Sequence, residues 1–343
     1  MKKLFALILA LSLLLALVAC GEKPAEAPAE QPAETAAEAP AEPAPEETIV
    51  RLGSLKGPTT MGMVKLLDDN DKGLTENKYT FQMAAAADEL TPLLLTGELD
   101  MIGVPINLAA VLHHNSEHNV QLIAVNTLGV LYVLEKGGET VTDIESLRGK
   151  TIYATGKGSV PYFTLRYLMA QHGLDIDNDV TMEWKSEPTE IVAQLAAQEQ
   201  AIAMLPQPFV TVASTQVEGL RVALDLTEEW DKLDNGSKLV TAGVVVRKAF
   251  AEEHPDKVAK FLEEYAASVE YVNANPAEAA QLIEQFDIVK APIAEKALPK
   301  CNLVCITGAD LQPTVEGYLQ ALYEQKPNAV GGEMPDADSY YGG

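Results

Sequence analysis

The spacing of apolar and polar residues predicts two consecutive α/β units from Thr48 onward. Short apolar runs typical of buried strands, TIVRLGSL in the first unit and KTIYATG in the second, each enter a glycine-containing turn. Apolar residues then recur at helical spacing over about 59–69 and 161–172. A second strand, a second helix and a third short strand that stops at a proline follow in each unit. The pattern predicts β-α-β-α-β twice, so each unit is expected to build a small parallel sheet covered by helices.

The two units align with each other at a constant spacing. The segment SLKGPTTMGMVKLL lies opposite TGKGSVPYFTLRYL, which places Lys157 and Gly158 101 residues after Lys56 and Gly57. The same spacing joins PLLLTGELDMIGVPINLA to AQLAAQEQAIAMLPQPFV without a gap. We interpret this as an internal duplication, which predicts one lobe for each copy and a cleft between them.

Two further apolar runs predict that the chain crosses between the lobes twice. VQLIAVNTLGVLYVLEKGG leaves the first lobe and KLVTAGVVVRKAF leaves the second, and helical patterns follow to the C-terminus. We expect these last helices to return to the first lobe. Lobe 1 is therefore predicted to comprise residues 48–132 and 243–343, and lobe 2 residues 133–242, joined by a hinge of two crossings.

The N-terminal segment has the pattern of an export signal. Two lysines precede an apolar run that is too short to span a bilayer and ends in LVAC, which resembles the lipobox of bacterial lipoproteins. We expect residues 1–19 to be removed and Cys20 to carry the lipid that anchors the protein to the outer face of the cytoplasmic membrane. Residues 20–47, rich in Ala, Glu and Pro, lack an apolar face and predict a disordered tether.

The charge of the chain narrows the choice of partners. A formal net charge of −25 disfavours nucleic acid and anionic membrane surfaces. A small anion remains a suitable ligand, because local backbone donors act over shorter distances than the net charge. We predict a monomer with a small-molecule ligand, and neither a cofactor nor a bound metal.

Candidate ligand-binding residues come from the two turns, the strand ends and the crossings. Ligands of open α/β sheets bind beyond the carboxyl ends of the strands, where helix N-termini offer unpaired N–H groups to an anion. The turns supply Lys56, Gly57, Thr59, Thr60, Lys157, Gly158 and Ser159, the ends of the third strands supply Asn107 and Gln207, and the crossings supply Asn126, Thr127 and Thr241.

Each of these groups also has a structural interpretation. The hydroxyl residues of the turns are equally suited to capping the helices that follow, and the two lysines to a solvated rim. His114 and His118 lie four residues apart, but their loop-like context led us to expect no metal. Cys301 and Cys305 could form a disulfide on a turn or stay as two buried thiols, and the spacing alone does not decide.

The segments LKGPTTMGMVKLL, GELDMIGVPINLAAVL, GKGSVPYFTLRYLMAQHGL and PNAVGGEMPDADSYY resemble one group of ABC-importer solute-binding lipoproteins. That group includes binders of nitrate, sulfonates, taurine and thiamine precursors. The resemblance covers nearly the whole predicted globular part. It implies the type II periplasmic binding fold, closure on a ligand by a hinge, and delivery of that ligand to a membrane permease. The alternative is an enzyme of pyrimidine or thiamine-precursor metabolism on the same fold, but the cysteine-rich iron motif of such enzymes is absent from the sequence.

Overall fold

A computed structural model describes residues 48 to 342 of the chain. The predicted signal peptide, Cys20 and the tether up to residue 47 lie outside the described residues. Among the helices that are described, none combines the length and the apolar character needed to cross a bilayer.

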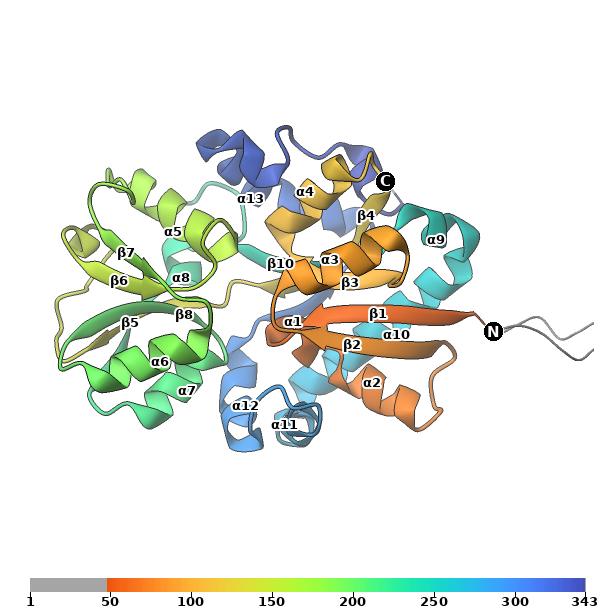
Figure 1. The fold of residues 1–343 in the computed structure, drawn as a ribbon, viewed down its shortest axis with the longest axis horizontal. Coiled ribbons are helices and arrows are strands. Elements are labelled where there is room, and N and C mark those ends of the chain that lie inside the picture. Colours follow the sequence, from red (N-terminus) through yellow and green to blue (C-terminus); the bar gives the residue numbers. More distant parts are fainter. Residues whose placement is uncertain (1–47, 343) are drawn as a thin grey trace, which may run out of the picture. The chain divides into compact units, whose positions relative to one another are not determined.

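Two mixed β-sheets form the centres of the two lobes (Figure 1). Lobe 1 has the strand order β11-β4-β10-β3-β1-β2 and lobe 2 the order β7-β6-β8-β5-β9. The strands of the first sheet are β1 (Ile49–Leu55), β2 (Lys78–Ala84), β3 (Met101–Pro105), β4 (Val120–Leu128), β10 (Val240–Arg247) and β11 (Leu303–Ile306). Those of the second are β5 (Leu131–Lys136), β6 (Thr151–Ala154), β7 (Thr181–Trp184), β8 (Ala201–Pro206) and β9 (Leu220–Asp225).

The first three strands of each copy are parallel, as predicted, but neither sheet is purely parallel. In lobe 1, β1 pairs in parallel with β2 and β3, and β10 then inserts antiparallel between β3 and β4. In lobe 2, β5 occupies the corresponding place between β8 and β9. Each inserted strand is one that has just crossed from the other lobe, so the crossings are built into the sheets themselves.

Helices cover both faces of each sheet (Figure 1). The helices of the duplicated region are α1 (Pro58–Met61), α2 (Val64–Asp71), α3 (Ala87–Thr96), α4 (Ile106–Asn115), α5 (Val160–Gln171), α6 (Pro188–Ala197) and α7 (Phe209–Gln216). The later ones are α8 (Leu226–Asp231), α9 (Lys248–Glu253), α10 (Pro255–Ala274), α11 (Pro276–Gln285), α12 (Ala291–Ala297) and α13 (Leu311–Gln325). Helices α3 and α6 begin and end 101 residues apart, and Glu89 and Glu190 each accept a hydrogen bond from the backbone at the start of their helix.

The helix predicted over about 59–69 is interrupted, because α1 ends at Met61 and α2 begins at Val64. Gly62 lies at the break, where an added Cβ would come within 3.1 Å of the Tyr265 hydroxyl. The Ser268 hydroxyl on α10 donates to the Gly62 carbonyl at 2.7 Å and accepts from the Leu66 N–H at 3.1 Å. A side chain 200 positions away thus satisfies backbone groups that a continuous helix would pair internally.

The lobe boundaries predicted after residues 132 and 242 fall inside strands of the structure. Leu131 and Tyr132 already pair with β8 of the second sheet, and Val240 and Ala242 with strands of the first. The chain therefore changes sheets between Leu128 and Leu131 and again before Val240.

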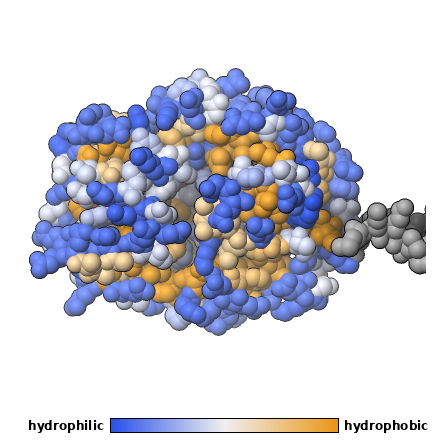
Figure 2. Space-filling view, viewed as in Figure 1, coloured by the Kyte–Doolittle hydropathy of each residue, from blue (hydrophilic) through white to orange (hydrophobic). Residues whose placement is uncertain are grey.

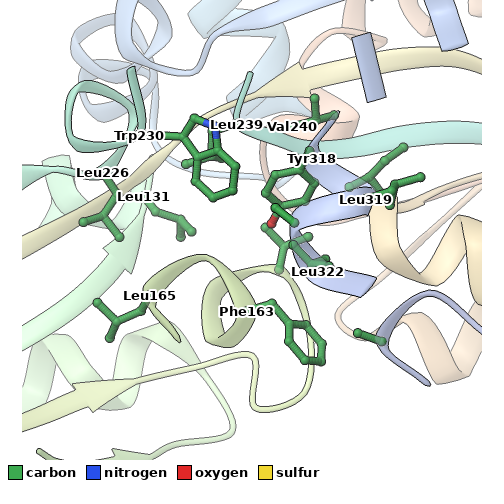
Figure 3. Close-up of a cluster of buried hydrophobic side chains, with 14 of the residues drawn as sticks. Leu131, Phe163, Leu165, Leu226, Trp230, Leu239, Val240, Tyr318, Leu319 and Leu322 are labelled. Atoms are coloured by element: carbon green, nitrogen blue, oxygen red, sulfur yellow. The ribbon is translucent and has the colours of Figure 1, made fainter. Parts of the chain in front are cut away.

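The sequence predicts that the last helices return to lobe 1. The C-terminal helix α13 instead packs against both lobes. Tyr318 and Leu322 of α13 lie in one buried cluster with Phe163 of α5 and Trp230 of α8 (Figure 3). The Trp230 and Tyr318 ring centroids are 5.1 Å apart, and the Tyr318 hydroxyl lies 2.8 Å from the Thr164 hydroxyl of α5. Helix α13 thus joins the two lobes beside the crossings.

Candidate ligand-binding site between the lobes

The turn after β1 is closed by its own hydrogen bonds. Gly57 has φ +132° and ψ −151°, a conformation that is essentially restricted to glycine. The hydroxyls of Thr59 and Thr60 both donate to the Leu55 carbonyl at 2.6 Å, and both side chains are buried. Neither threonine caps α1, because the N-cap residue is Gly57. These two residues therefore hold the turn together instead of capping the helix, and their contact with a ligand stays a prediction.

Lys56 leans away from the turn towards the C-terminal part of lobe 1. Its Nζ lies 3.8 Å from Oδ2 of Asp287, and both side chains are well exposed. An exposed pair at this distance stabilises little, but it places the lysine charge beside a carboxylate of its own lobe. This arrangement favours the predicted rim position for Lys56.

The equivalent turn of lobe 2 is open. Gly156 and Gly158 have φ of +77° and +76°, and Ser159, the N-cap residue of α5, makes no side-chain cap hydrogen bond. Lys157 is exposed and makes no ion pair with any residue that the structure describes. Because α5 has 12 residues, its first turn presents free N–H groups and a partial positive charge.

Lys157 and Gly158 line a surface hollow of about 510 Å³. Tyr162 and Trp184 of lobe 2 contribute aromatic walls, and Lys326, just after α13, adds a second positive charge. In the space-filling view the surface is also hollowed along the line where the two lobes meet (Figure 2). Asp177 also lines the hollow, so the open turn lies at a concave part of the surface that carries two lysines and one aspartate.

The predicted crossing residues lie next to one another. Strands β4 and β10 are antiparallel neighbours, with Thr127 opposite Ala242, so Asn126 and Thr127 adjoin Thr241. The Thr127 hydroxyl donates to Asn126 Oδ1 at 3.0 Å, and both side chains are fully buried. These three residues mark the edge of the first sheet that faces the crossings.

Asn107 and Gln207 also lie beside the crossings. Asn107 is in the first turn of α4, after β3 has paired through Pro105 with Ala242, and its Nδ2 donates to the Ala329 carbonyl at 3.3 Å. The Gln207 N–H donates to the Val130 carbonyl at 3.0 Å, and its Oε1 accepts from the Thr211 hydroxyl. Both side chains are buried, so each lobe brings one amide to the junction.

Several buried polar atoms near the junction have no hydrogen-bond partner within the described part of the chain. They are Ser54 Oγ, Asn107 Oδ1, Asn126 Nδ2, Gln207 Nε2, Thr227 Oγ1 and Thr241 Oγ1. Buried polar groups in folded proteins are nearly always paired, so a group of unpaired ones indicates a missing partner. All but Asn107 Oδ1 are hydroxyl or amide donors.

Ser54 and Thr227 were not among the residues that the sequence suggested. Ser54 is the single hydroxyl residue of β1 and lies two positions before Lys56 in the turn that follows. A Cβ on Gly103 would lie 2.7 Å from Ser54 Oγ and 3.6 Å from Asn126 Nδ2, so glycine keeps the space between these two groups open. The signal in the sequence was a small polar residue near the end of an apolar strand, opposite a glycine on the neighbouring strand.

Two other groups of residues are not part of this set of unpartnered donors. Cys301 and Cys305 are free thiols, and burial raises the pKa of Cys301 to about 12 and that of Cys305 to about 11. His114 and His118 come together with His113, which the sequence interpretation had not considered as a third member.

Comparisons with known proteins identify the family. Residues 44–286 match the model of the NMT1-like family, and the chain belongs to that family. No curated protein sequence is significantly similar to it.

Solved structures with the same fold include periplasmic binding proteins. An ABC transporter protein from Parabacteroides distasonis is 23% identical, with a TM-score of 0.72, and the match covers 86% of this chain and 99% of that one. The aliphatic sulphonate binding protein SsuA of Escherichia coli is 16% identical, with a TM-score of 0.69 and coverage of 85% and 92%. The alkanesulfonate-binding protein SsuA of Xanthomonas axonopodis, bound to MOPS, is 16% identical, with a TM-score of 0.65 and coverage of 85% and 96%. The predicted type II periplasmic-binding-protein fold, with two α/β lobes, is confirmed.

Proposed function

We propose that this protein is the extracytoplasmic solute-binding component of an ABC importer. It captures a small anionic organic solute between its two lobes and delivers the solute to a membrane permease. Family membership and the shared fold support this role, and two structural neighbours are named as sulfonate-binding proteins. In this proposal Cys20 carries the lipid anchor and the monomeric binding domain works at the outer face of the cytoplasmic membrane.

The observation that carries the proposal is the set of unpartnered buried donors at the junction. Five of the six atoms can donate a hydrogen bond, from Ser54, Asn126, Gln207, Thr227 and Thr241. A sulfonate or carboxylate head group offers only acceptor oxygens, so it can pair with all five groups, whereas an ammonium group could pair with the three hydroxyls but would leave the amide N–H groups of Asn126 and Gln207 unpaired. The excess of donors therefore favours an anionic head group over a cationic or purely apolar ligand.

The open turn of lobe 2 supplies the positive charge. Lys157 is free of carboxylate partners among the described residues, and the first turn of α5 adds backbone N–H groups that no side chain caps. Charge-assisted hydrogen bonds of this kind are roughly twice as strong as neutral ones. Lys56, in contrast, already neighbours Asp287 and contributes less to the ligand.

Closure of the two lobes around the solute would use the paired crossings as a hinge. Strands β4 and β10 run side by side where the chain changes sheets, and α13 packs on helices of both lobes. A ligand that contacts both lobes binds the closed state better than the open state and shifts the population towards it. A permease can then recognise the closed form.

A matched series of ligands tests the proposal. Hexanesulfonate and heptanoate share the hexyl chain of hexanol and hexylamine and differ from them only in the head group. We expect the two anions to raise the melting temperature, with a stabilisation of about 2.7 kcal/mol at 100 times Kd, and the other two to have no effect. Nitrate and an aminopyrimidine thiamine precursor extend the panel.

Two results would contradict the proposal. If only hexylamine or hexanol raises the melting temperature, the proposal that the ligand is an anion is wrong. Conversion of any stabilising compound, followed by NMR over many hours with the protein at catalytic concentration, would favour the enzyme alternative over a receptor.

A further inference from the structure

Three of the five histidines of the chain meet at the far end of helix α4. His113 and His114 belong to the last turn of α4, and His118 follows in the loop that leads to β4. One ring nitrogen from each lies within 4.8 Å of those of the other two. The ring centroids are separated by 4.4 to 6.0 Å, and the rings stand at 76 to 90° to one another. The three imidazoles therefore point into a common space instead of stacking.

His113 has the arrangement of a metal ligand with its supporting hydrogen bond. Its Nδ1 donates to the Val120 carbonyl at 2.8 Å, which leaves Nε2 as the lone-pair nitrogen. Nε2 is buried and has no hydrogen-bond partner within the described residues. Metal-binding histidines commonly donate their second ring nitrogen to a backbone carbonyl in this way.

His114 provides a second, independent indication of a missing partner. Both of its ring nitrogens are buried without a hydrogen bond in the described part of the chain. Its ring packs directly against Gly331, where an added Cβ would overlap it. A buried imidazole with two unsatisfied nitrogens is unfavourable, and a metal ion on one of them would satisfy it.

Two carboxylates approach the same histidines from the C-terminal segment. Asp336 Oδ1 lies 3.6 Å from His113 Nε2, and Glu333 Oε1 lies 3.7 Å from His114 Nδ1. Both carboxylates are more than half exposed, so either can move towards a bound ion without disturbing the core. Asp338 is already paired with Lys248 and is the less suitable ligand.

We infer that His113, His114 and His118 form a binding site for a divalent transition metal of the zinc type, with Asp336, Glu333 or water as the fourth ligand. Imidazole nitrogen with one oxygen suits Zn²⁺, which binds in a tetrahedron at about 2.0–2.1 Å from each nitrogen. That geometry places ligand atoms about 3.3 Å apart, so the nitrogens need to close by about 1.5 Å at most. His118, in the loop and only partly buried, can make this adjustment.

This site is separate from the proposed solute site. Asn107 lies at the start of α4 and the histidines near its end, so about 10 Å along the helix axis separates them. The metal would join the α4–β4 turn to residues 331–340, which run along β4 near the C-terminus (Figure 1). Its expected role is to fasten the C-terminal segment to lobe 1.

Zinc titration of the purified, tag-free full chain after EDTA treatment tests the site. We expect one equivalent of Zn²⁺ to bind by calorimetry and to raise the melting temperature, and Co²⁺ to give the visible absorption of a tetrahedral ion. The variant His118→Asn should bind zinc at least tenfold more weakly. Asparagine tolerates the φ of +65° at this position, so the metal-free variant should melt like the metal-free wild type.

The remaining two histidines provide matched controls. His172→Asn and His254→Asn should bind zinc like the wild type. Absence of zinc binding, or equal affinity in the wild type and His118→Asn, would overturn the site. A loss of zinc affinity in the two control variants equal to that in His118→Asn would also overturn the site. If His118→Asn does not fold, His114→Gln takes its place under the same criteria. Binding of hexanesulfonate by His118→Asn reports separately on the proposed transport function.

Discussion

The turns at Leu55–Thr60 and Gly156–Pro161 are equivalent in sequence position but differ in chemistry. In lobe 1 the threonine hydroxyls bond back to the Leu55 carbonyl, the lysine leans towards Asp287, and the first helix lasts four residues. In lobe 2 the serine makes no cap bond, the lysine is unpaired within the described residues, and the helix lasts 12 residues. The two turns thus occupy equivalent places in the two sheets, but the first is closed by its own hydrogen bonds and the second is a candidate anion-binding turn.

The largest expected effect concerns the edge of the lobe 2 sheet that lies opposite the open turn. Glu135 of β5 accepts hydrogen bonds from Thr140 and Val141 and pairs with Arg221. Burial alone would raise the pKa of Glu135, but these hydrogen bonds outweigh it and lower the pKa to about 2. Glu135→Gln should therefore lower the free energy of unfolding at pH 7 by about 3 kcal/mol.

The same carboxylate predicts a pH dependence. Because the folded pKa lies below the ordinary value of 4.5, its stabilisation is complete above pH 4.5 and is lost as the pH falls towards 2. Urea unfolding of the wild type and Glu135→Gln at pH 7 and pH 3 measures this, and the gap between them should shrink at pH 3. The exposed Glu139→Gln is the control and should stay within about 0.5 kcal/mol of the wild type at both values. A gap that does not change with pH would contradict the account.

Replacing each of the two turn glycines with alanine should lower the free energy of unfolding, and by more in lobe 1 than in lobe 2. Gly57 has φ +132° and ψ −151°, so Gly57→Ala should cost about 2 kcal/mol. Gly158 has φ +76°, in the left-handed region, so Gly158→Ala should cost about 1 kcal/mol. An added Cβ meets nothing within 4 Å at either position, so backbone strain alone sets the difference. Chemical denaturation measures both, and equal or reversed costs would refute the conformational argument.

The hydroxyl residues should show opposite phenotypes. Thr60→Ala removes a buried hydrogen bond to the Leu55 carbonyl and should lower the free energy of unfolding by about 1 kcal/mol, with a small effect on ligand affinity. Ser159→Ala removes no hydrogen bond that the structure shows at the cap, so it should leave stability nearly unchanged and weaken hexanesulfonate binding. Paired unfolding and calorimetric titrations measure the two properties. A loss of stability in Ser159→Ala with unchanged affinity would indicate that Ser159 caps α5 and does not bind the ligand.

The smallest expected effect is spectroscopic. The chain has two tryptophans, Trp184 at the hollow beside the open turn and Trp230 in the cluster that joins the lobes. Fluorescence of the Trp230→Phe variant, which retains Trp184, should change when hexanesulfonate binds. The Trp184→Phe variant keeps the buried tryptophan and should change less. A larger response from Trp230 would instead indicate that the lobe junction rearranges more than the turn.

The local and repeated features of the fold were predictable from the sequence. Helices α3 and α6, the strands that stop at Pro105 and Pro206, and the two-lobed arrangement follow from hydrophobic period and a constant spacing. The break at Gly62 was not predictable, because it depends on Ser268 and Tyr265 from α10. The position of α13 across both lobes was missed for the same reason, since its apolar face fits either partner.

The sequence indicates where the candidate residues lie in the fold, but not which contacts their side chains make. All the crossing and strand-end residues that the sequence suggested lie beside the crossings, whereas Thr59 and Thr60 turn their hydroxyls to their own backbone. The sequence does not single out Ser54 or His113, because each residue fits the pattern of an ordinary strand or helix. The fold brings Ser54 close to Gly103 and His113 close to His118, and neither contact is evident from the sequence.

The central claim, that the lobe 2 turn holds the charge of an anionic solute, is tested most directly with the equivalent lysines. Calorimetric titration with hexanesulfonate compares the wild type, Lys157→Ala and Lys56→Ala. The account predicts that Lys157→Ala binds at least tenfold more weakly, since a hydrogen bond to a charged group is worth about 1.5–3 kcal/mol. Lys56→Ala should stay within about threefold of the wild type, because its charge already neighbours Asp287. Equal losses in the two variants, or a larger loss in Lys56→Ala, would contradict it.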